Sequence, residues 1–460
     1  MQAIVLAGGM GTRLRPLTYT RPKPMIAVAN RPAIDHIVAA AARAGFSEII
    51  IATNYMAEII QAYCATEPFP IPVRCLREDH PLGTAGAVKN VEDQITGPFA
   101  VIQGDSLSDI DLSGLVAAHR RLGGIATIAV MPVENPSEFG IVELDGEGRI
   151  VRFLEKPKRE ECFSNLANTG FYLFEPEILG HIPPGTAYDF SFELFPALLR
   201  TGKAIFGWQT QAYWIDLGRI ATYLAGNAHC LSRENGVLLA DGASVSPSVT
   251  LHPPVLVGDG VVVEEGCEFG PFASIGSGAR LGAGSRVRGS IVYERAVVGP
   301  GGLLDECVIA EETKVGRDVT IERLAVVGRG CTLGDGAKVK EGSRIGPFVV
   351  VEPQSVVDGV LSPKLDRIEH SHAVLSRHPA FAGLRAEELM LCTLLSELGE
   401  APAKTLAGLA KIPFSRIHSL LYGLEQRRLV AARGEAPKSF SLLYENPDRI
   451  ALRSARQRDG

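Results

Sequence analysis

Residues 6–14 of the chain read LAGGMGTRL, a glycine-rich turn that directly follows a short apolar run. The run at residues 3–6 is continuously apolar and is followed by small residues, which predicts a buried strand. A glycine-rich turn exposes backbone amides that can approach phosphate oxygens closely, because no side chains intervene. Arg13 and Lys23 add positive charge near this turn. The stretch therefore predicts a phosphate site at the end of the first strand of an α/β sheet.

Two other phosphate-binding patterns fit this turn poorly. The Walker pattern needs Lys followed by Ser or Thr directly after its last glycine, but residues 12–13 are Thr-Arg. The dinucleotide fingerprint needs a third glycine where Leu14 stands and an acidic residue after the second strand, where residues 53–54 are Thr-Asn. A P-loop ATPase and a dinucleotide-binding domain are thus disfavoured, and a glycine turn without a ligand remains the alternative.

Residues 1–235 alternate apolar runs with amphipathic stretches, the pattern of strands and helices in an α/β domain. Residues 34–44 have helical spacing and stop at Gly45, which suits a left-handed cap. The further strand candidates are residues 49–53, 99–103 and 125–131. We expect a Rossmann-like, mostly parallel sheet with a site at the carboxyl ends of its strands.

Residues 240–360 have a different pattern, in which an apolar residue recurs at every sixth position. The recurring residues are Val257, Val263, Phe269, Ile275, Leu281 and Val287, and then Val315, Ile321, Val327, Leu333, Val339 and Ile345. The segment resembles the left-handed parallel β-helix of the hexapeptide-repeat family, in which such side chains stack into one inward column. The two runs are out of frame by four residues, so we expect a bulge or loop between residues 288 and 314.

Residues 380–460 return to helical spacing and resemble a winged-helix domain. Residues 405–427 predict a helix-turn-helix, and residues 429–432 and 440–443 predict the strands of a wing. The segment is similar to the winged-helix part of sugar-sensing archaeal-type transcription regulators. On that resemblance the residues that could face DNA are Ser415, Arg416, His418 and Ser419 in the reading helix and Arg433 and Lys438 in the wing. Nucleic-acid binding is a possible but disfavoured function, since winged helices also serve as protein-interaction modules.

Length, charge and cysteine content limit the classes of function that this chain can have. The chain has 460 residues, which predicts about three domains, and its formal net charge of -6 gives no general attraction to nucleic acid or anionic lipid. No apolar run reaches the roughly 20 residues of a membrane span, and the start lacks a signal-peptide pattern. The 8 cysteines are scattered without a CxxC pair, as expected of reduced thiols. We expect a cytoplasmic protein with no membrane partner.

The N-terminal motif is extended by PLT at residues 16–18 and PKPM at residues 22–25. Together these stretches resemble the start of the sugar-nucleotide pyrophosphorylase family, which carries a GGxGTRLxPLTxxxPKPM-like sequence. The resemblance implies transfer of a nucleotidyl group from a nucleoside triphosphate to a sugar 1-phosphate, with release of pyrophosphate. It implies that the nucleotide is bound by Leu6, Ala7, Gly8, Gly9, Gly11, Thr12, Glu78, Gly83, Thr84 and Ala85.

Asp105 and Asp216 occupy the positions where this family places magnesium-binding carboxylates. Asp105 follows the strand candidate at residues 101–103, and Asp216 lies in WIDLG at residues 214–218. Two carboxylates suit a Mg²⁺ ion that also takes phosphate oxygens and water. With Arg13 and Lys23 they form the expected catalytic set. The alternative is a turn residue at Asp105 and a helix cap at Asp216.

The residues that bind the sugar phosphate are assigned in the same way, by matching the family's motifs in chain order. The resemblance implies a pocket formed by Gly140, Glu155, Lys156, Asn168 and Gly170. Lys156 would contact the phosphate, Glu155 and Asn168 the sugar hydroxyls, and the two glycines would contribute backbone contacts. An ordinary exposed charge pair is the alternative for residues 155–156.

The choice of substrates and any second activity stay open at this level. The LGTAG loop at residues 82–86 looks most like that of mannose-1-phosphate guanylyltransferases, which favours GTP and mannose 1-phosphate, while UTP, dTTP or ATP with glucose 1-phosphate are alternatives. An acyltransferase activity of the β-helix would need a histidine base, and residues 240–359 contain only His252. We expect the β-helix to serve self-association into a homo-oligomer instead.

Overall fold

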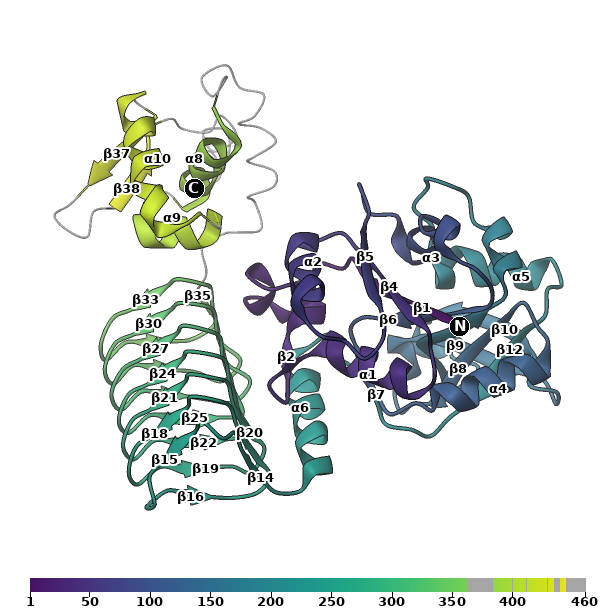
Figure 1. Ribbon diagram of the computed structural model, residues 1–460, viewed down its shortest axis with the longest axis horizontal. Helices are drawn as coiled ribbons and strands as arrows, with labels where there is room; N and C mark the ends of the chain where they lie inside the picture. Colours follow the sequence, from purple (N-terminus) through teal and green to yellow (C-terminus); the bar gives the residue numbers. More distant parts are fainter. Residues whose placement is uncertain (362–383, 399, 411, 428, 434–438, 444–460) are drawn as a thin grey trace. The chain divides into compact units, whose positions relative to one another are not determined.

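The computed structural model describes residues 1–361, 384–398, 400–410, 412–427, 429–433 and 439–443 (Figure 1). The chain divides into two compact units. The first comprises Met1–Leu14 and Arg21–Arg233, and the second comprises Arg15–Thr20 and the chain from Glu234 onward. Among the described residues, none of the helices combines the length and apolar character that crossing a bilayer requires.

A nine-stranded sheet forms the centre of the first unit. Its strands follow the order β10-β9-β11-β6-β1-β4-β5, and β8 pairs with both β11 and β12. One half of the sheet is parallel and consists of β1 (Gln2–Ala7), β4 (Glu48–Thr53), β5 (Val73–Arg77) and β6 (Phe99–Gln103). These bounds confirm the strands predicted at residues 3–6, 49–53 and 99–103.

The other half of the sheet is mainly antiparallel, so the expected α/β sheet is mixed rather than mostly parallel. β11 (Leu166–Phe174) runs antiparallel to β6, to β8 (Ala126–Pro132) and to β9 (Gly140–Leu144). β9 and β10 (Ile150–Glu155) are joined by a short turn at residues 145–149, which only an antiparallel pair allows. β12 (Ile205–Gln209) then pairs parallel with β8.

Six α-helices accompany this sheet. They are α1 (Ala33–Arg43), α2 (Ala57–Thr66), α3 (Gly83–Lys89), α4 (Leu112–Leu122), α5 (Phe195–Arg200) and α6 (Ile220–Glu234). α1 buries Ile34, Ile37 and Val38 at its amphipathic spacing, and Gly45 follows it with φ +79°, the left-handed conformation predicted there. A π-helical turn, η8 (Phe190–Leu194), leads into α5.

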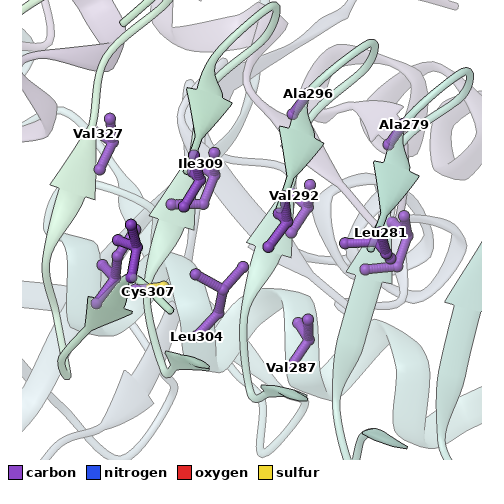
Figure 2. Packing of buried hydrophobic residues seen from close by; sticks show 14 of the residues in the cluster. Ala279, Leu281, Val287, Val292, Ala296, Leu304, Cys307, Ile309 and Val327 are labelled. Atoms are coloured by element: carbon purple, nitrogen blue, oxygen red, sulfur yellow. The ribbon is translucent and has the colours of Figure 1, made fainter. Parts of the chain in front are cut away.

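In the second unit, three parallel sheets of 8, 7 and 7 strands form a β-helix that runs from β14 (Val237–Leu239) to β35 (Val360–Leu361). Each coil contributes one strand to each sheet, and Val257 lies beside Ile275 in the next coil. The inward residues form one column that includes Leu281, Val292 and Ile309 (Figure 2). The hexapeptide prediction is therefore confirmed, in the three-sided form of the left-handed class.

The expected bulge or loop between residues 288 and 314 was wrong. The frame changes because two successive turns between the same two sheets, each a corner of the β-helix, are one residue shorter than the equivalent turns in the coils just before and after them. Inward residues at the corresponding corner lie six positions apart from Phe269 to Ile275, but five apart from Val287 to Val292 and again from Leu304 to Ile309. Shortening a corner leaves the parallel ladders intact, so the column continues without interruption.

The C-terminal part packs three helices and a small antiparallel sheet around its own core. The elements are α8 (Ala386–Leu398), β36 (Glu400–Pro402), α9 (Ala403–Ala410), α10 (Phe414–Gln426), β37 (Val430–Arg433) and β38 (Ser439–Leu442). The helices and strands lie close to the ranges predicted for them, with the sheet order β36-β38-β37, while the winged-helix assignment and its function stay predictions. Arg416 on α10 pairs with Glu387 at 2.8 Å, and Lys438 lies outside the described residues.

Candidate active site

The carboxyl ends of β1 and β6 open at the same edge of the sheet, because the two strands are parallel neighbours. β1 continues into Gly8 and Gly9, and β6 continues into Gly104 and Asp105. The Gly104 amide donates to the Leu6 carbonyl at 2.9 Å, and a Cβ at Gly104 would lie only 2.6 Å from that carbonyl oxygen. This close approach places Asp105 beside the glycine turn.

A second pairing brings Asp216 to the same edge. β7 (Ser106–Ser108) and β13 (Trp214–Asp216) form an antiparallel pair in which Asp216 lies opposite Ser106. The Leu217 amide also donates to the Asp105 carbonyl at 2.9 Å. Two carboxylates far apart in the sequence thus become neighbours.

Lys23 joins the two carboxylates directly. Its Nζ lies 2.6 Å from Asp105 Oδ2 and 3.1 Å from Asp216 Oδ1, and its side chain is only 7% exposed. Arg13 Nη2 approaches Asp216 Oδ2 at 3.4 Å from a more open position, with 59% of its side chain exposed. A buried ammonium needs such partners, because an unpaired charge in this position would be strongly destabilising. The four residues of the expected catalytic set therefore form one cluster.

A cavity of about 300 Å³ lies next to this cluster, along the glycine turn. Of the expected nucleotide residues it is lined by Leu6, Ala7, Gly8, Gly9, Glu78, Gly83 and Thr84. Gly11, Thr12 and Ala85 do not line it. The Ala85 amide instead donates to the Tyr188 carbonyl at 2.9 Å, so it is not free to contact a base.

Glu78 is a buried residue that lines this cavity. Its Oε2 accepts from the Leu82 amide at 3.3 Å, and Asn54 Nδ2 donates to the Glu78 carbonyl at 3.2 Å. A Cβ at Gly8 would lie 3.9 Å from Glu78 Oε1, so the other carboxyl oxygen faces the glycine turn. Burial raises the pKa of Glu78, and the Leu82 amide opposes this shift.

A larger cavity of about 730 Å³ adjoins the first one. It is lined by all five residues expected at the sugar phosphate, namely Gly140, Glu155, Lys156, Asn168 and Gly170, together with Arg13 and Asp216. Thr84, Gln103 and Asp105 line both cavities. The two cavities therefore meet at Asp105, which belongs to the cluster of Arg13, Lys23 and the two aspartates.

Glu155 and Lys156 both line this larger cavity but differ in burial. The Glu155 side chain is mostly buried. Burial raises the pKa of its carboxyl, and this effect outweighs the lowering by Lys156 and Ser191. Lys156 is 63% exposed, with its Nζ 3.9 Å from Glu155 Oε1. A Cβ at Gly140 would lie 2.4 Å from Glu155 Oε2, so this glycine makes room for the carboxyl. The pair is thus more than an exposed ion pair.

Asn168 is fixed by its neighbours. Its Nδ2 donates to Tyr172 Oη at 2.9 Å, and its Oδ1 accepts from the Gly170 amide at 3.0 Å. Gly170 has φ +80°, and a Cβ there would lie 2.4 Å from Gln103 Cγ. The expected backbone contact from Gly170 is therefore limited to its carbonyl, because its amide is already used.

Known proteins match both units of the chain. The nucleotidyl transferase family model matches residues 2–233, about half of the chain. This chain belongs to the sugar nucleotidyltransferase family. A second model, the GMPPB C-terminal domain, matches residues 251–337 within the β-helix.

Two relatives of this nucleotidyltransferase are named for different nucleotides and different sugar phosphates. UTP–glucose-1-phosphate uridylyltransferase of Synechocystis sp. is 35% identical over 264 residues, which cover 54% of this chain and 68% of the relative. Mannose-1-phosphate guanylyltransferase of Mycobacterium tuberculosis is 35% identical over 264 residues, which cover 55% of this chain and 73% of the relative. The crystal structure of HddC from Yersinia pseudotuberculosis matches with 26% identity and a TM-score of 0.44, over 50% of this chain and 99% of that chain.

The nucleotidyltransferase site also contains residues that the sequence did not indicate. They include Asn54 in the smaller cavity, Gln103 in both cavities, and Tyr172, Asp189, Ser191, Phe192 and Arg219 in the larger one. Arg219 pairs with Glu138 at 3.1 Å on the cavity lining. The one available signal was Asp189 directly before an apolar helical run, which is typical of a helix cap. It does not indicate a substrate pocket.

The two aspartates of this nucleotidyltransferase suit a magnesium ion. The described residues contain no group of three or more His, Cys, Asp and Glu side chains that could hold a metal. Mg²⁺ does not need such a group, because it commonly takes one or two carboxylates and completes its shell with water and phosphate oxygens. Asp105 and Asp216 keep roughly a third of their side chains exposed toward the larger cavity, so the donor set fits.

Proposed function

We propose that this sugar-1-phosphate nucleotidyltransferase transfers a guanylyl group from GTP to mannose 1-phosphate, giving GDP-mannose and pyrophosphate. The observation that supports the choice of base is the buried Glu78 carboxyl in the smaller cavity. Guanine presents two adjacent donors, N1–H and the N2 amino group, and one carboxylate can accept both. Uracil and thymine present a single donor between two carbonyl groups, and adenine presents one amino group.

The choice of sugar rests on the relatives. The Mycobacterium tuberculosis enzyme is named for mannose 1-phosphate and a guanylyl group. The Synechocystis enzyme, at the same identity, is named for UTP and glucose 1-phosphate. UTP with glucose 1-phosphate is therefore the second candidate pair.

The reaction depends on the positioning of its two substrates and on charge compensation, and it needs no covalent protein intermediate. A sugar phosphate bound near Lys156 presents an oxygen that is already anionic, so no general base is required for its attack on the α-phosphorus. Arg13 and Lys23 compensate the charge that develops on the departing pyrophosphate. Asp105 and Asp216 would hold Mg²⁺, which neutralises phosphate charge when bound.

The substrate test is a panel of GTP, UTP, dTTP and ATP with mannose and glucose 1-phosphates, scored by pyrophosphate release. We expect GTP with mannose 1-phosphate to give the highest kcat/KM. Glu78→Gln should lower kcat/KM for GTP by about ten- to a hundredfold, because one acceptor becomes a donor. Glu147→Gln, in an exposed turn, is the matched control. Preferred turnover of UTP with glucose 1-phosphate would overturn this substrate pair while leaving the reaction class intact.

The acyltransferase alternative gains no support from His252. The histidine is 46% exposed, and its Nε2 lies 2.9 Å from Glu268 Oε1 on the next coil. This arrangement is that of an ordinary exposed pair. We therefore propose a structural role for the β-helix, in self-association.

A further inference from the structure

A short segment before η8 connects the two cavities. The Tyr188 amide donates to the Leu82 carbonyl at 2.9 Å, and the Tyr188 carbonyl accepts from the amides of Ala85 and Gly86 at 2.9 and 3.0 Å. Gly83 has φ +73°, and a Cβ there would lie 2.7 Å from the Tyr188 carbonyl oxygen. Leu82 and the first turn of α3, where the sequence had suggested a loop, border the smaller cavity and are therefore joined closely to the segment at residues 186–189.

Asp189 extends this connection through its side chain. Its Oδ2 accepts from Thr84 Oγ1 at 2.8 Å, and its Oδ1 accepts from the Ser191 and Phe192 amides at 2.7 and 3.1 Å. Thr84 Oγ1 in turn accepts from the Phe190 amide at 2.9 Å. One carboxylate thus caps the π-helical turn and also holds the only hydroxyl proton of Thr84.

The residues joined by these hydrogen bonds line different cavities. Thr84 lines both cavities, whereas Asp189, Ser191 and Phe192 line only the larger one. Ser191 lies beside the groups assigned to the sugar hydroxyls, since Asn168 Nδ2 donates to Ser191 Oγ at 3.5 Å and the neighbouring Ser191 side chain lowers the pKa of Glu155. π-helical turns are rare and are found frequently at functional sites.

We propose that Asp189 is a positioning residue that couples the two substrates. A nucleotide bound against Thr84 holds the Thr84–Asp189 pair in place, and Asp189 then holds Ser191 where it orients Glu155 and Asn168 toward the sugar. The sugar phosphate therefore binds more tightly to the nucleotide-loaded enzyme than to the free enzyme. This proposal rests on the assignment of the two cavities to nucleotide and sugar phosphate. Because coupling is reciprocal, the sugar phosphate strengthens nucleotide binding by the same factor.

Replacing the Asp189 carboxylate by an amide tests the coupling separately from the role of Asp189 as a helix cap. In Asp189→Asn the side-chain oxygen still accepts from the Ser191 and Phe192 amides, since Asn is as good a helix cap as Asp. The new NH₂ group, however, cannot accept the Thr84 hydroxyl proton. Asp145→Asn is the matched control, because Asp145 makes an equivalent pair of bonds to the Glu147 and Arg149 amides, both at 2.9 Å, in the exposed β9–β10 turn.

The test is calorimetric binding of the sugar 1-phosphate with and without a non-hydrolysable analogue of the nucleotide preferred in the panel. We expect the bound nucleotide to tighten sugar-phosphate binding at least about fivefold in the natural enzyme and in Asp145→Asn. In Asp189→Asn this factor should fall to about one, and KM for the sugar phosphate should rise while kcat changes little. Thr84→Val should behave like Asp189→Asn, Thr84→Ser should retain the coupling, and the Thr84→Val/Asp189→Asn double variant should lose no more than either single variant.

Three outcomes would overturn the proposal: an unchanged coupling factor in Asp189→Asn, a fall in kcat at constant KM, or an equal loss of affinity for both substrates, as a purely structural role predicts. Failure of the substrate assignment would be seen separately, because the panel with the natural enzyme decides it. The coupling experiment then uses whichever pair the enzyme turns over.

Discussion

The β-helix and the nucleotidyltransferase sheet bury apolar residues equally well, but they depend on different kinds of contact. In the β-helix, Leu281 packs on Val263 and Val298 of adjacent coils, and every coil repeats the same arrangement. In the sheet, Asp105 and Asp216 meet only because β7 pairs with β13. A repeat spreads stability over many equivalent contacts. A site concentrates function in a few contacts between distant segments.

This contrast is tested most strongly at the two aspartates. Asp105→Asn and Asp216→Asn should each lower kcat by about a thousandfold, because they weaken the charge compensation at the α-phosphorus. Folding should be retained, with the circular dichroism spectrum unchanged. Pyrophosphate release, with and without EDTA, measures the loss. Near-normal rates in both variants would remove the proposed metal site.

The opposite pattern is expected inside the β-helix. Ile309 is fully buried in the column, so Ile309→Ala should lower the free energy of unfolding by about 2–4 kcal/mol while kcat of the folded enzyme stays unchanged. Val356→Ala, at a position that is 61% exposed on the last coil, should have little effect and serves as the control. Urea unfolding monitored together with activity distinguishes the two variants. A parallel loss of kcat in Ile309→Ala would remove the contrast between the two regions.

A smaller effect is expected where the site depends on space rather than charge. Gly140→Ala places a methyl group 2.4 Å from Glu155 Oε2, so the carboxyl must move, and KM for the sugar phosphate should rise about tenfold. Gly146→Ala in the β9–β10 turn is the control, since its Cβ would meet no atom within 4 Å among the residues that the structure describes. Steady-state kinetics compare the pair. Equal KM values would mean that Glu155 does not contact the sugar.

The smallest effect is a pH dependence of nucleotide binding. Burial raises the pKa of Glu78 above its ordinary value of 4.5, so the carboxylate that we propose as the guanine acceptor is lost as the pH falls through this raised pKa. KM for GTP should therefore increase severalfold toward acidic pH, at a higher pH than an exposed carboxyl would produce. Glu78→Gln should remove this dependence. A flat profile in the natural enzyme would argue against Glu78 as the guanine partner.

Several features of the site could be predicted because they depend on neighbouring residues. The glycine turn after β1 and the strands of the parallel half follow from local spacing and residue type. The two aspartates and the five residues expected at the sugar phosphate were assigned through the family's motif order. Asp189 could not be assigned in this way, since a cap before a helix has no visible relation to Thr84, more than a hundred positions earlier in the chain.

The sequence by itself determined the elements and the repeat, since a period of six, a helical period and a glycine after an apolar run are all local properties. Only the tertiary structure decided that most strand pairs in one half of the sheet are antiparallel, that two shortened corners replace a loop, and that Ala85 faces Tyr188 instead of a ligand. The physical reason is that strand pairing and close backbone approach depend on contacts between segments far apart in the chain. Those contacts leave no periodic signal in either segment alone.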